Sequence, residues 1–184
     1  MPGSEETLIA ILPTEEVTAA QRAAVIEVCI AAHDHVGFRN LFTTFIPSGG
    51  RHFLGYRGSE LVAHAVVTTR WLQPAGQPEL KTAYVDAVST LPAYQRLGHA
   101  STVMSRLAAE IDDYEIACLQ TDRPAFYERL GWEVWRGPLA GRGEHGLIPT
   151  PEQSGVMVLR LPRTPPLDLA AQLTIECQPY RIWE

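Results

Sequence analysis

Cysteine and ordered clusters of metal ligands are scarce in this chain of 184 residues. Its three cysteines, Cys29, Cys118 and Cys177, lie far apart and form no C-x-x-C pair. We therefore expect neither a disulfide framework nor a cysteine-ligated zinc site. The six histidines are scattered and lack ligand spacing with a carboxylate or cysteine partner, so no metal is predicted. The pair His33 and His35 is interpreted as a feature of a helix end.

Long apolar runs and an excess of positive charge are also missing. No apolar segment reaches the roughly 20 residues of a membrane span. The first residues, Met-Pro-Gly-Ser-Glu-Glu, lack the basic and apolar regions of a secretion signal. The formal net charge of −6 argues against nucleic acid or an anionic membrane as a partner and is compatible with a cationic substrate. We expect a cytoplasmic protein, and the 46% apolar composition suits one domain over residues 1–184.

The most informative segment is residues 84–101, where an alternating strand leads through a loop into a helix. The expected helix carries one apolar stripe, formed at i, i+3, i+4, i+7, i+8 and i+11 by Ala100, Val103, Met104, Leu107, Ala108 and Ile111. The backbone amides of residues 95–100 would converge with the positive end of the helix dipole, an arrangement that binds a pyrophosphate. Many α/β proteins have such a junction and bind nothing there, so this segment alone decides little.

A second segment, residues 124–132, predicts a short helix that ends at Gly131 and is followed by the start of a strand. Together the two segments resemble motifs A and B of the GNAT family of N-acetyltransferases. The Q-x-x-G-x-A loop at residues 95–100 fits the family's pyrophosphate pattern, and its spacing to F-Y-x-x-x-G-W at residues 126–132 also fits. The mixture of strands and helices is α/β or α+β by pattern. The resemblance implies the GNAT fold, with a central twisted mixed sheet flanked by helices and a V-shaped cofactor cleft.

The resemblance implies acetyl-CoA as co-substrate, with its pantetheine amides paired to the backbone of the central strand. The implied cofactor-binding residues are Val88, Ser89, Thr90, Gln95, Arg96, Leu97, Gly98, His99, Ala100 and Ser101. A thioester is already a good acyl donor, so placing an uncharged amine and steadying the oxyanion account for most of the catalysis. The Val88 backbone N–H is the candidate oxyanion donor. The alternative is that residues 88–90 are ordinary members of a strand ladder.

Two side chains are candidates for proton transfer. An amine substrate arrives mostly protonated, and Asp86 is the candidate base because a carboxylate in so apolar a strand is costly unless it is paired or used. The family often has Glu here, and the shorter Asp would act through a water; the alternative is an ion pair with an arginine. Because side chains alternate along a strand with a period of two, one face of this strand is expected to carry Tyr84, Asp86, Val88 and Thr90. Tyr127 occupies the position of the family's tyrosine that protonates the departing thiolate; alternatively it is a core residue that only touches the cofactor.

The C-terminal part resembles the aminoglycoside 2'-N-acetyltransferases through residues 131–138, 150–159 and 166–173. This implies acetylation of the 2'-amino group of an aminoglycoside, antibiotic resistance and a homodimer. Its acidic pattern is thinner than in those enzymes, with Arg181 near the chain end.

Enzymes that bind such polycations line the cleft with carboxylates. The candidate substrate-binding residues are Asp34, Asp122, Glu152, Trp183 and Glu184. Each acid is alternatively a solvated surface group. Two other functions stay open: acetylation of another small amine, such as a polyamine, and a non-catalytic acyl-CoA-binding sensor.

The rest of the chain predicts a first strand at residues 8–12 and a helix opened by a capping box at Thr18. A hairpin is expected within residues 52–70, followed by a Pro/Gly loop at residues 71–77. Residues 136–154 are rich in Gly and Pro and are interpreted as a loop long enough to form a functional lid.

Overall fold

The computed structural model describes residues 6–183, which divide into two compact units whose segments alternate along the chain. Unit 1 comprises Met1–Thr68 and Val85–Glu110, and unit 2 comprises Thr69–Tyr84 and Ile111–Glu184. The assignment of residues 1–184 to a single domain stays a prediction. Among the described residues, no helix is both long enough and apolar enough to cross a membrane.

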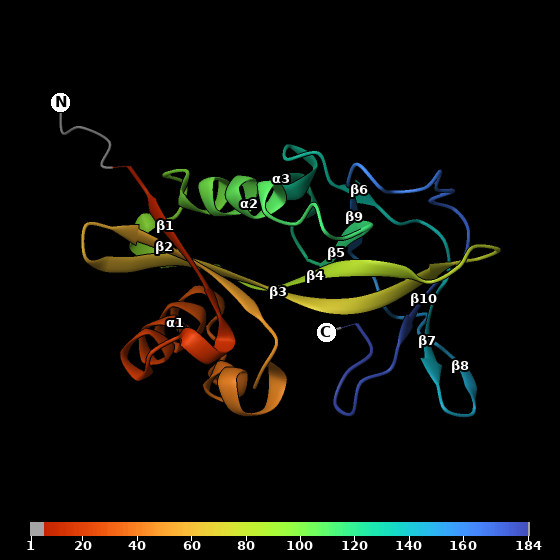
Figure 1. The fold of residues 1–184 in the computed structure, drawn as a ribbon, viewed down its shortest axis with the longest axis horizontal. Helices are drawn as coiled ribbons and strands as arrows, with labels where there is room; N and C mark the ends of the chain where they lie inside the picture. Colours follow the sequence, from red (N-terminus) through yellow and green to blue (C-terminus); the bar gives the residue numbers. More distant parts are fainter. Residues whose placement is uncertain (1–5, 184) are drawn as a thin grey trace. The chain divides into compact units, whose positions relative to one another are not determined.

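Figure 1 shows the strands and helices in chain order. The strands are β1 (Leu8–Pro13), β2 (Arg51–Arg57), β3 (Glu60–Pro74), β4 (Leu80–Thr90), β5 (Ile116–Gln120), β6 (Glu133–Val134), β7 (Leu139–Gly143), β8 (Gly146–Pro149), β9 (Val156–Arg160) and β10 (Leu173–Glu176). The α-helices are α1 (Ala19–His33), α2 (His99–Ala109) and α3 (Pro124–Glu128). The short helical turns are η1 (Thr14–Glu16), η2 (Val36–Asn40), η3 (Leu41–Phe45) and η4 (Pro92–Tyr94).

Unit 1 contains β1, β2 and the first part of β3, which pair in antiparallel order. Helix α1 begins with the predicted capping box. The Thr18 hydroxyl accepts from the Gln21 backbone N–H at 3.3 Å, and the Gln21 side chain accepts from the Thr18 N–H at 3.0 Å. This prediction is confirmed, and it explains why the helix starts directly after Thr18.

Helices α1 and α2 cover opposite faces of β2. Leu54 packs with Val25 and Val28 of α1 in one buried cluster. A Cβ on the next residue, Gly55, would lie 3.0 Å from the Val103 side chain of α2. Successive strand residues point to opposite faces, so the two helices lie on either side of this strand, as Figure 1 also shows.

The predicted apolar stripe of α2 is the side that packs inward. Within this helix Val103, Met104 and Leu107 are fully buried. The apolar period of 3.6 residues therefore identified the correct face of the helix.

Unit 2 has a mixed sheet in the order β6-β9-β5-β4-β3-β10-β7-β8. Strand β5 runs parallel to β4, and β7 runs parallel to β10, whereas the β5–β9, β6–β9, β3–β10 and β7–β8 pairs are antiparallel. Strands β3 and β4 continue along the chain into unit 1, where β3 pairs with β2. The mixed sheet and its helices agree with the fold class expected from the sequence.

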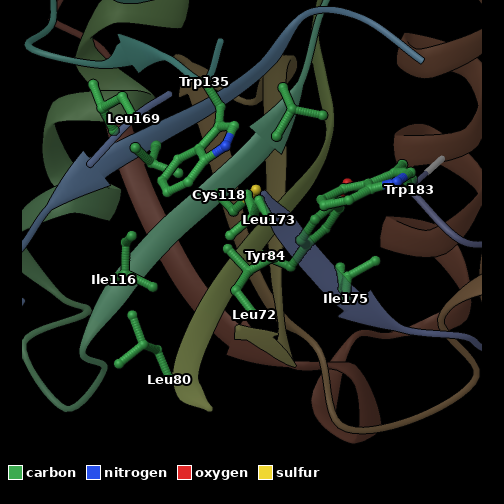
Figure 2. Packing of buried hydrophobic residues seen from close by; sticks show 12 residues of the cluster. Leu72, Leu80, Tyr84, Ile116, Cys118, Trp135, Leu169, Leu173, Ile175 and Trp183 are labelled. Carbon is green, nitrogen blue, oxygen red and sulfur yellow. The ribbon is translucent and has the colours of Figure 1, made fainter. Parts of the chain in front are cut away.

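The core of unit 2 gathers large side chains from β3, β4, β5, β10 and the chain end (Figure 2). Tyr84 and Trp183 lie close together in this core, and the Tyr84 hydroxyl donates to the Trp183 carbonyl oxygen. The Trp135 indole N–H donates to the Ala171 carbonyl oxygen at 2.8 Å, so its polar edge is satisfied although the ring is buried.

Two expected loops prove to be strands. Strand β3 extends to Pro74, through the first four residues of the segment 71–77 that was predicted as a loop. Residues 136–154 contain the hairpin β7–β8, so their interpretation as a lid loop is wrong. Strand β7 takes β10 as its partner, from more than 30 residues further along the chain, and such a distant pairing leaves no local pattern.

Candidate active site

Strand β4 is distorted at Ala87, in the segment that the sequence assigns to catalysis. Ala87 has a φ of 50°, a left-handed conformation that is uncommon for a residue with a side chain. Such a residue interrupts the regular pleat as a bulge does. The predicted strict alternation, with Asp86 and Val88 on one face, therefore does not hold across this position.

Two histidines contact the backbone at the distortion and directly after it. His64 Nδ1 lies 3.0 Å from the Ala87 carbonyl oxygen. His33 Nε2 lies 3.1 Å from the Val88 carbonyl oxygen and 3.0 Å from Ser89 Oγ. Sequence reasoning missed both roles, because a single histidine on a strand or at a helix end carries no spacing that predicts a partner so far along the chain.

The loop after β4 folds back on the strand. The Gln95 side-chain amide donates to the Thr90 carbonyl oxygen at 3.2 Å. Arg96 and Gly98 both have positive φ values, 64° and 93°. Successive amides in such a turn form a concave nest that suits an anion. Leu97 between them is 65% exposed, so the loop lies at the surface.

Helix α2 begins at this loop without a side-chain cap. Its N-cap is Gly98, which has no side chain to bind the first amides, and a Cβ built there meets nothing within 4 Å. The first amides of an α-helix have no partner within the helix and carry partial positive charge. Residues 88–90 and 95–101 thus form one continuous strand, turn, loop and helix start within unit 1, as expected.

Two side chains in this segment have special environments. His99 is buried, its Nδ1 lies 2.8 Å from Thr7 Oγ1, and burial together with the Arg57 charge lowers the pKa of its imidazole. It can therefore offer a ligand only its backbone. The Thr90 hydroxyl is buried and has no hydrogen-bond partner within residues 6–183. A buried hydroxyl without a partner is costly, which marks this end of β4 as a place where a ligand could bind.

Tyr127 lies on α3 in unit 2 and is 8% exposed. Its ring meets the Trp132 ring edge-on at a centroid distance of 6.1 Å. Burial raises the pKa of the hydroxyl to about 12, against a smaller opposing effect of Arg123 and with a minor contribution from Asp122 in the same direction. At neutral pH the side chain therefore keeps its proton, as a general acid must before it acts.

The three acids proposed for substrate binding are exposed but do not come from one unit. Asp34 is the C-cap of α1 in unit 1, with a φ of 50°. Asp122 and Glu152 belong to unit 2, and Asp122 pairs loosely with Arg123 at 3.8 Å. Their contact with a substrate stays a prediction.

The two chain-end candidates differ. Trp183 is 1% exposed and donates its indole N–H to Thr150 Oγ1 at 3.1 Å, so the ring belongs to the core of unit 2 (Figure 2). Glu184 lies outside the described residues. Within the described part of the chain, no three His, Cys, Asp or Glu side chains are grouped so as to hold a metal ion.

A family model described as an acetyltransferase (GNAT) domain matches residues 25–135, which is more than half of the chain. The chain belongs to the GNAT acetyltransferase family. The matched region contains β4, α2, the loop between them and Tyr127. The sequence predicts acetyl-CoA as co-substrate, and this prediction is confirmed at the level of the family.

Solved structures share the fold of this GNAT domain at low sequence identity. Eis1 from Mycobacterium abscessus is 20% identical with a TM-score of 0.58, over 73% of this chain and 33% of Eis1. The GNAT family N-acetyltransferase YhbS from Escherichia coli, solved in complex with CoA, is 13% identical with a TM-score of 0.67, over 97% of this chain and 93% of YhbS. ElaA from Escherichia coli is 18% identical with a TM-score of 0.56, over 84% of this chain and 100% of ElaA.

The chain spans only about a third of the length of Eis1 and of two further matched structures, from Enterococcus faecalis and Kribbella flavida. The aminoglycoside subtype is not part of what these similarities establish.

Proposed function

We propose that this GNAT domain is an acetyl-CoA-dependent N-acetyltransferase that acetylates a primary amine of a small cationic molecule. The observation that carries the proposal is the uncapped start of α2, which directly follows the two positive-φ positions Arg96 and Gly98. A helix start of this kind binds phosphate without needing a basic side chain. The family match adds the reaction class.

Each part of the segment has a role in the proposed reaction. The amides of residues 97–101 hold the pyrophosphate of acetyl-CoA, and the backbone of residues 88–90 pairs with its pantetheine arm, beside the Thr90 hydroxyl, which finds no hydrogen-bond partner among the described residues. Acetyl-CoA supplies an acyl group activated as a thioester. The Val88 N–H stabilises the oxyanion that forms when the amine attacks the carbonyl carbon.

Proton transfers complete the reaction. Asp86 accepts the proton of the ammonium group through a water, and this leaves an uncharged amine to attack. A carbon–nitrogen bond forms, the carbon–sulfur bond breaks, and Tyr127 gives its proton to the departing thiolate. The nitrogen of the new amide loses its extra proton to solvent, and Tyr127 takes a proton back from solvent. Because burial raises the pKa of Tyr127 to about 12, the hydroxyl is protonated at neutral pH and has a proton to give.

The first acceptor to test is the 2'-amino group of an aminoglycoside. The net charge of −6 and the exposed carboxylates of Asp34, Asp122 and Glu152 favour a polycationic substrate. Another small amine, such as a polyamine, would satisfy the same electrostatic requirement, so both classes belong in one screen. A role in antibiotic resistance follows only if an aminoglycoside is turned over.

The decisive experiment measures the release of free thiol from acetyl-CoA in the presence of aminoglycosides, polyamines and other amines. Wild-type protein is compared with Asp86→Ala and Tyr127→Phe, and with His145→Leu on the exposed β7–β8 turn as a matched control. We expect turnover with at least one amine, a strong loss in the first two variants and none in the control.

Calorimetry with CoA distinguishes failure of the enzyme proposal from failure of the binding-site assignment. If CoA binds but no amine is acetylated, the enzyme proposal is wrong and an acyl-CoA-binding sensor takes its place. If CoA gives no heat of binding, the site itself is wrongly assigned.

A further inference from the structure

Three buried polar side chains form a hydrogen-bonded series in unit 1 that ends at the distorted residue of β4. Thr14 Oγ1 lies 3.1 Å from His52 Nε2, His52 Nδ1 lies 3.0 Å from His64 Nε2, and His64 Nδ1 lies 3.0 Å from the Ala87 carbonyl oxygen. Thr14, His52 and His64 are completely buried. None of these three side chains has a role in the acetyl transfer proposed above.

The direction of each hydrogen bond in this series follows from the Ala87 carbonyl oxygen at its end. A carbonyl oxygen only accepts, so His64 carries its proton on Nδ1 and its Nε2 is an acceptor. His52 must then donate from Nδ1, and its own Nε2 accepts from the Thr14 hydroxyl, which has the Gly50 carbonyl oxygen at 3.2 Å as an alternative acceptor. The Thr14 oxygen in turn accepts from the Gly50 N–H at 3.0 Å.

This set of hydrogen bonds requires both imidazoles to be neutral, because a proton on His64 Nε2 would face the Nδ1 proton of His52, and a proton on His52 Nε2 would turn the Thr14 hydroxyl away toward the Gly50 carbonyl oxygen. Their surroundings agree with this. Burial is the main cause that lowers the pKa of His52 to about 4 and that of His64 to about 3. The nearby Arg22 charge adds to the effect at His52, and His52 adds to it at His64.

The hydrogen bond to Ala87 also fixes the direction of the next amide. In a trans peptide, the C=O of one residue and the N–H of the next point in opposite directions within one plane. His64 reaches Ala87 from the face that α1 covers, since its Nδ1 also lies 3.8 Å from Cys29 Sγ of α1. The Val88 N–H of the same peptide therefore points toward the other face, which α2 covers. Helix α2 presents its uncapped amides on that face.

We propose that His64, supported by His52, is a positioning residue that holds the Ala87–Val88 peptide so that the Val88 N–H meets the oxyanion. This role rests on the proposed acetyl transfer. A left-handed alanine is an unfavourable conformation that the surroundings must impose, and the donor on His64 is the group that imposes it. His33, at the Val88 carbonyl oxygen, secures the following peptide.

The test compares His64→Leu, which removes the donor, with His64→Asn, whose amide nitrogen occupies nearly the place of Nδ1. Loss of a backbone oxyanion donor lowers kcat by about 100-fold to 1,000-fold, so its misalignment in His64→Leu should lower kcat by at least 10-fold. The KM for acetyl-CoA and the Kd for CoA should change less than about twofold, because the pyrophosphate loop is untouched. His64→Asn should recover most of kcat.

The outcomes separate this inference from the proposed function. No turnover by wild-type protein with any amine refutes the proposed function. Normal wild-type turnover together with an unchanged kcat in folded His64→Leu refutes the positioning role alone, as does an equal loss in His64→Asn and His64→Leu.

If His64→Leu does not fold, the wild-type protein still provides a test. Long-range nitrogen–proton NMR correlations should show both buried histidines as neutral Nδ1–H tautomers at pH 7. An Nε2–H tautomer on either one overturns the inference.

Discussion

Acidification should destabilise this protein through its two buried histidines, and the size of the effect follows from their pKa values. The ordinary value of 6.5 falls to about 4 for His52 and to about 3 for His64 in the folded state. Between pH 6.5 and pH 4, the unfolded chain therefore binds protons that the folded protein excludes. Stability is fully present above pH 6.5 and is lost as the pH falls through this window.

The magnitude is set by linkage. Each histidine contributes up to about 1.4 kcal/mol of lost stability per pH unit, so the pair contributes up to about 3 kcal/mol per pH unit. Over two pH units this approaches the whole free energy of unfolding of a typical domain, which is about 5–15 kcal/mol. The Glu15 carboxylate raises the pKa of His52 and so partly offsets the effect of burial. The folded protein therefore takes up a proton at His52 at a higher pH than burial alone would allow.

The assay is urea unfolding followed by tryptophan fluorescence at several pH values from 7.5 to 4.5. Carboxylates also titrate in this range, so the informative quantity is the difference between wild-type protein and His64→Asn, which keeps a donor but cannot be protonated. We expect the variant to lose about 1.4 kcal/mol per pH unit of the wild-type slope. The exposed His145→Asn should keep the wild-type slope. Identical slopes for wild-type protein and His64→Asn would refute the assignment of a buried, neutral His64.

Three further results are expected. Gly155→Ala should lower the free energy of unfolding by roughly 3 kcal/mol, because Gly155 has a φ of 71° and a Cβ there would lie 1.8 Å from the Thr121 carbonyl oxygen. Glu176→Gln should cost roughly 3 kcal/mol in the same urea assay, since Arg70 is completely buried and Glu176 is its charged partner at 2.9 Å. Tyr127→Phe should lower kcat roughly 100-fold while the Kd for CoA stays unchanged. Because the pKa of Tyr127 is raised to about 12, loss of its proton should cause no decline in the kcat of wild-type protein up to about pH 10.

Each of these variants has a matched control. Gly49→Ala has a similar φ of 70° and open space around the added Cβ, so it should cost only about 1 kcal/mol. Glu110→Gln breaks the exposed Arg106–Glu110 pair and should cost less than about 1 kcal/mol. Tyr180→Phe removes a hydroxyl from an exposed ring and should leave kcat unchanged. If control and test variants change equally, the structural reason given for the test variant is wrong.

Local patterns in the sequence were sufficient for the helices and for the loop between β4 and α2. The α2 stripe and the capping box at Thr18 both come from short-range rules of period and hydrogen bonding. These rules act within a few residues, so one sequence reveals them.

The features that the sequence did not reveal depend on partners far along the chain, or on a residue whose type gives no sign of its backbone conformation. The hairpin β7–β8 depends on pairing with β10, and the buried His52 and His64 depend on elements that come together only in the fold. The left-handed residue of β4 is Ala87, and alanine gives no sign of such a backbone. The catalytic roles of Asp86 and Tyr127 stay predictions, because they need a bound substrate to be tested.

Ala87 limits how this strand can evolve or be redesigned. Methods that choose residues by strand preference would place valine, isoleucine or threonine there, since branched side chains dominate strands. A branched Cβ is the least compatible with a φ of 50°, so those substitutions would force the strand to straighten. A saturation library at this position, selected for activity, should return mainly glycine, asparagine, aspartate and the original alanine.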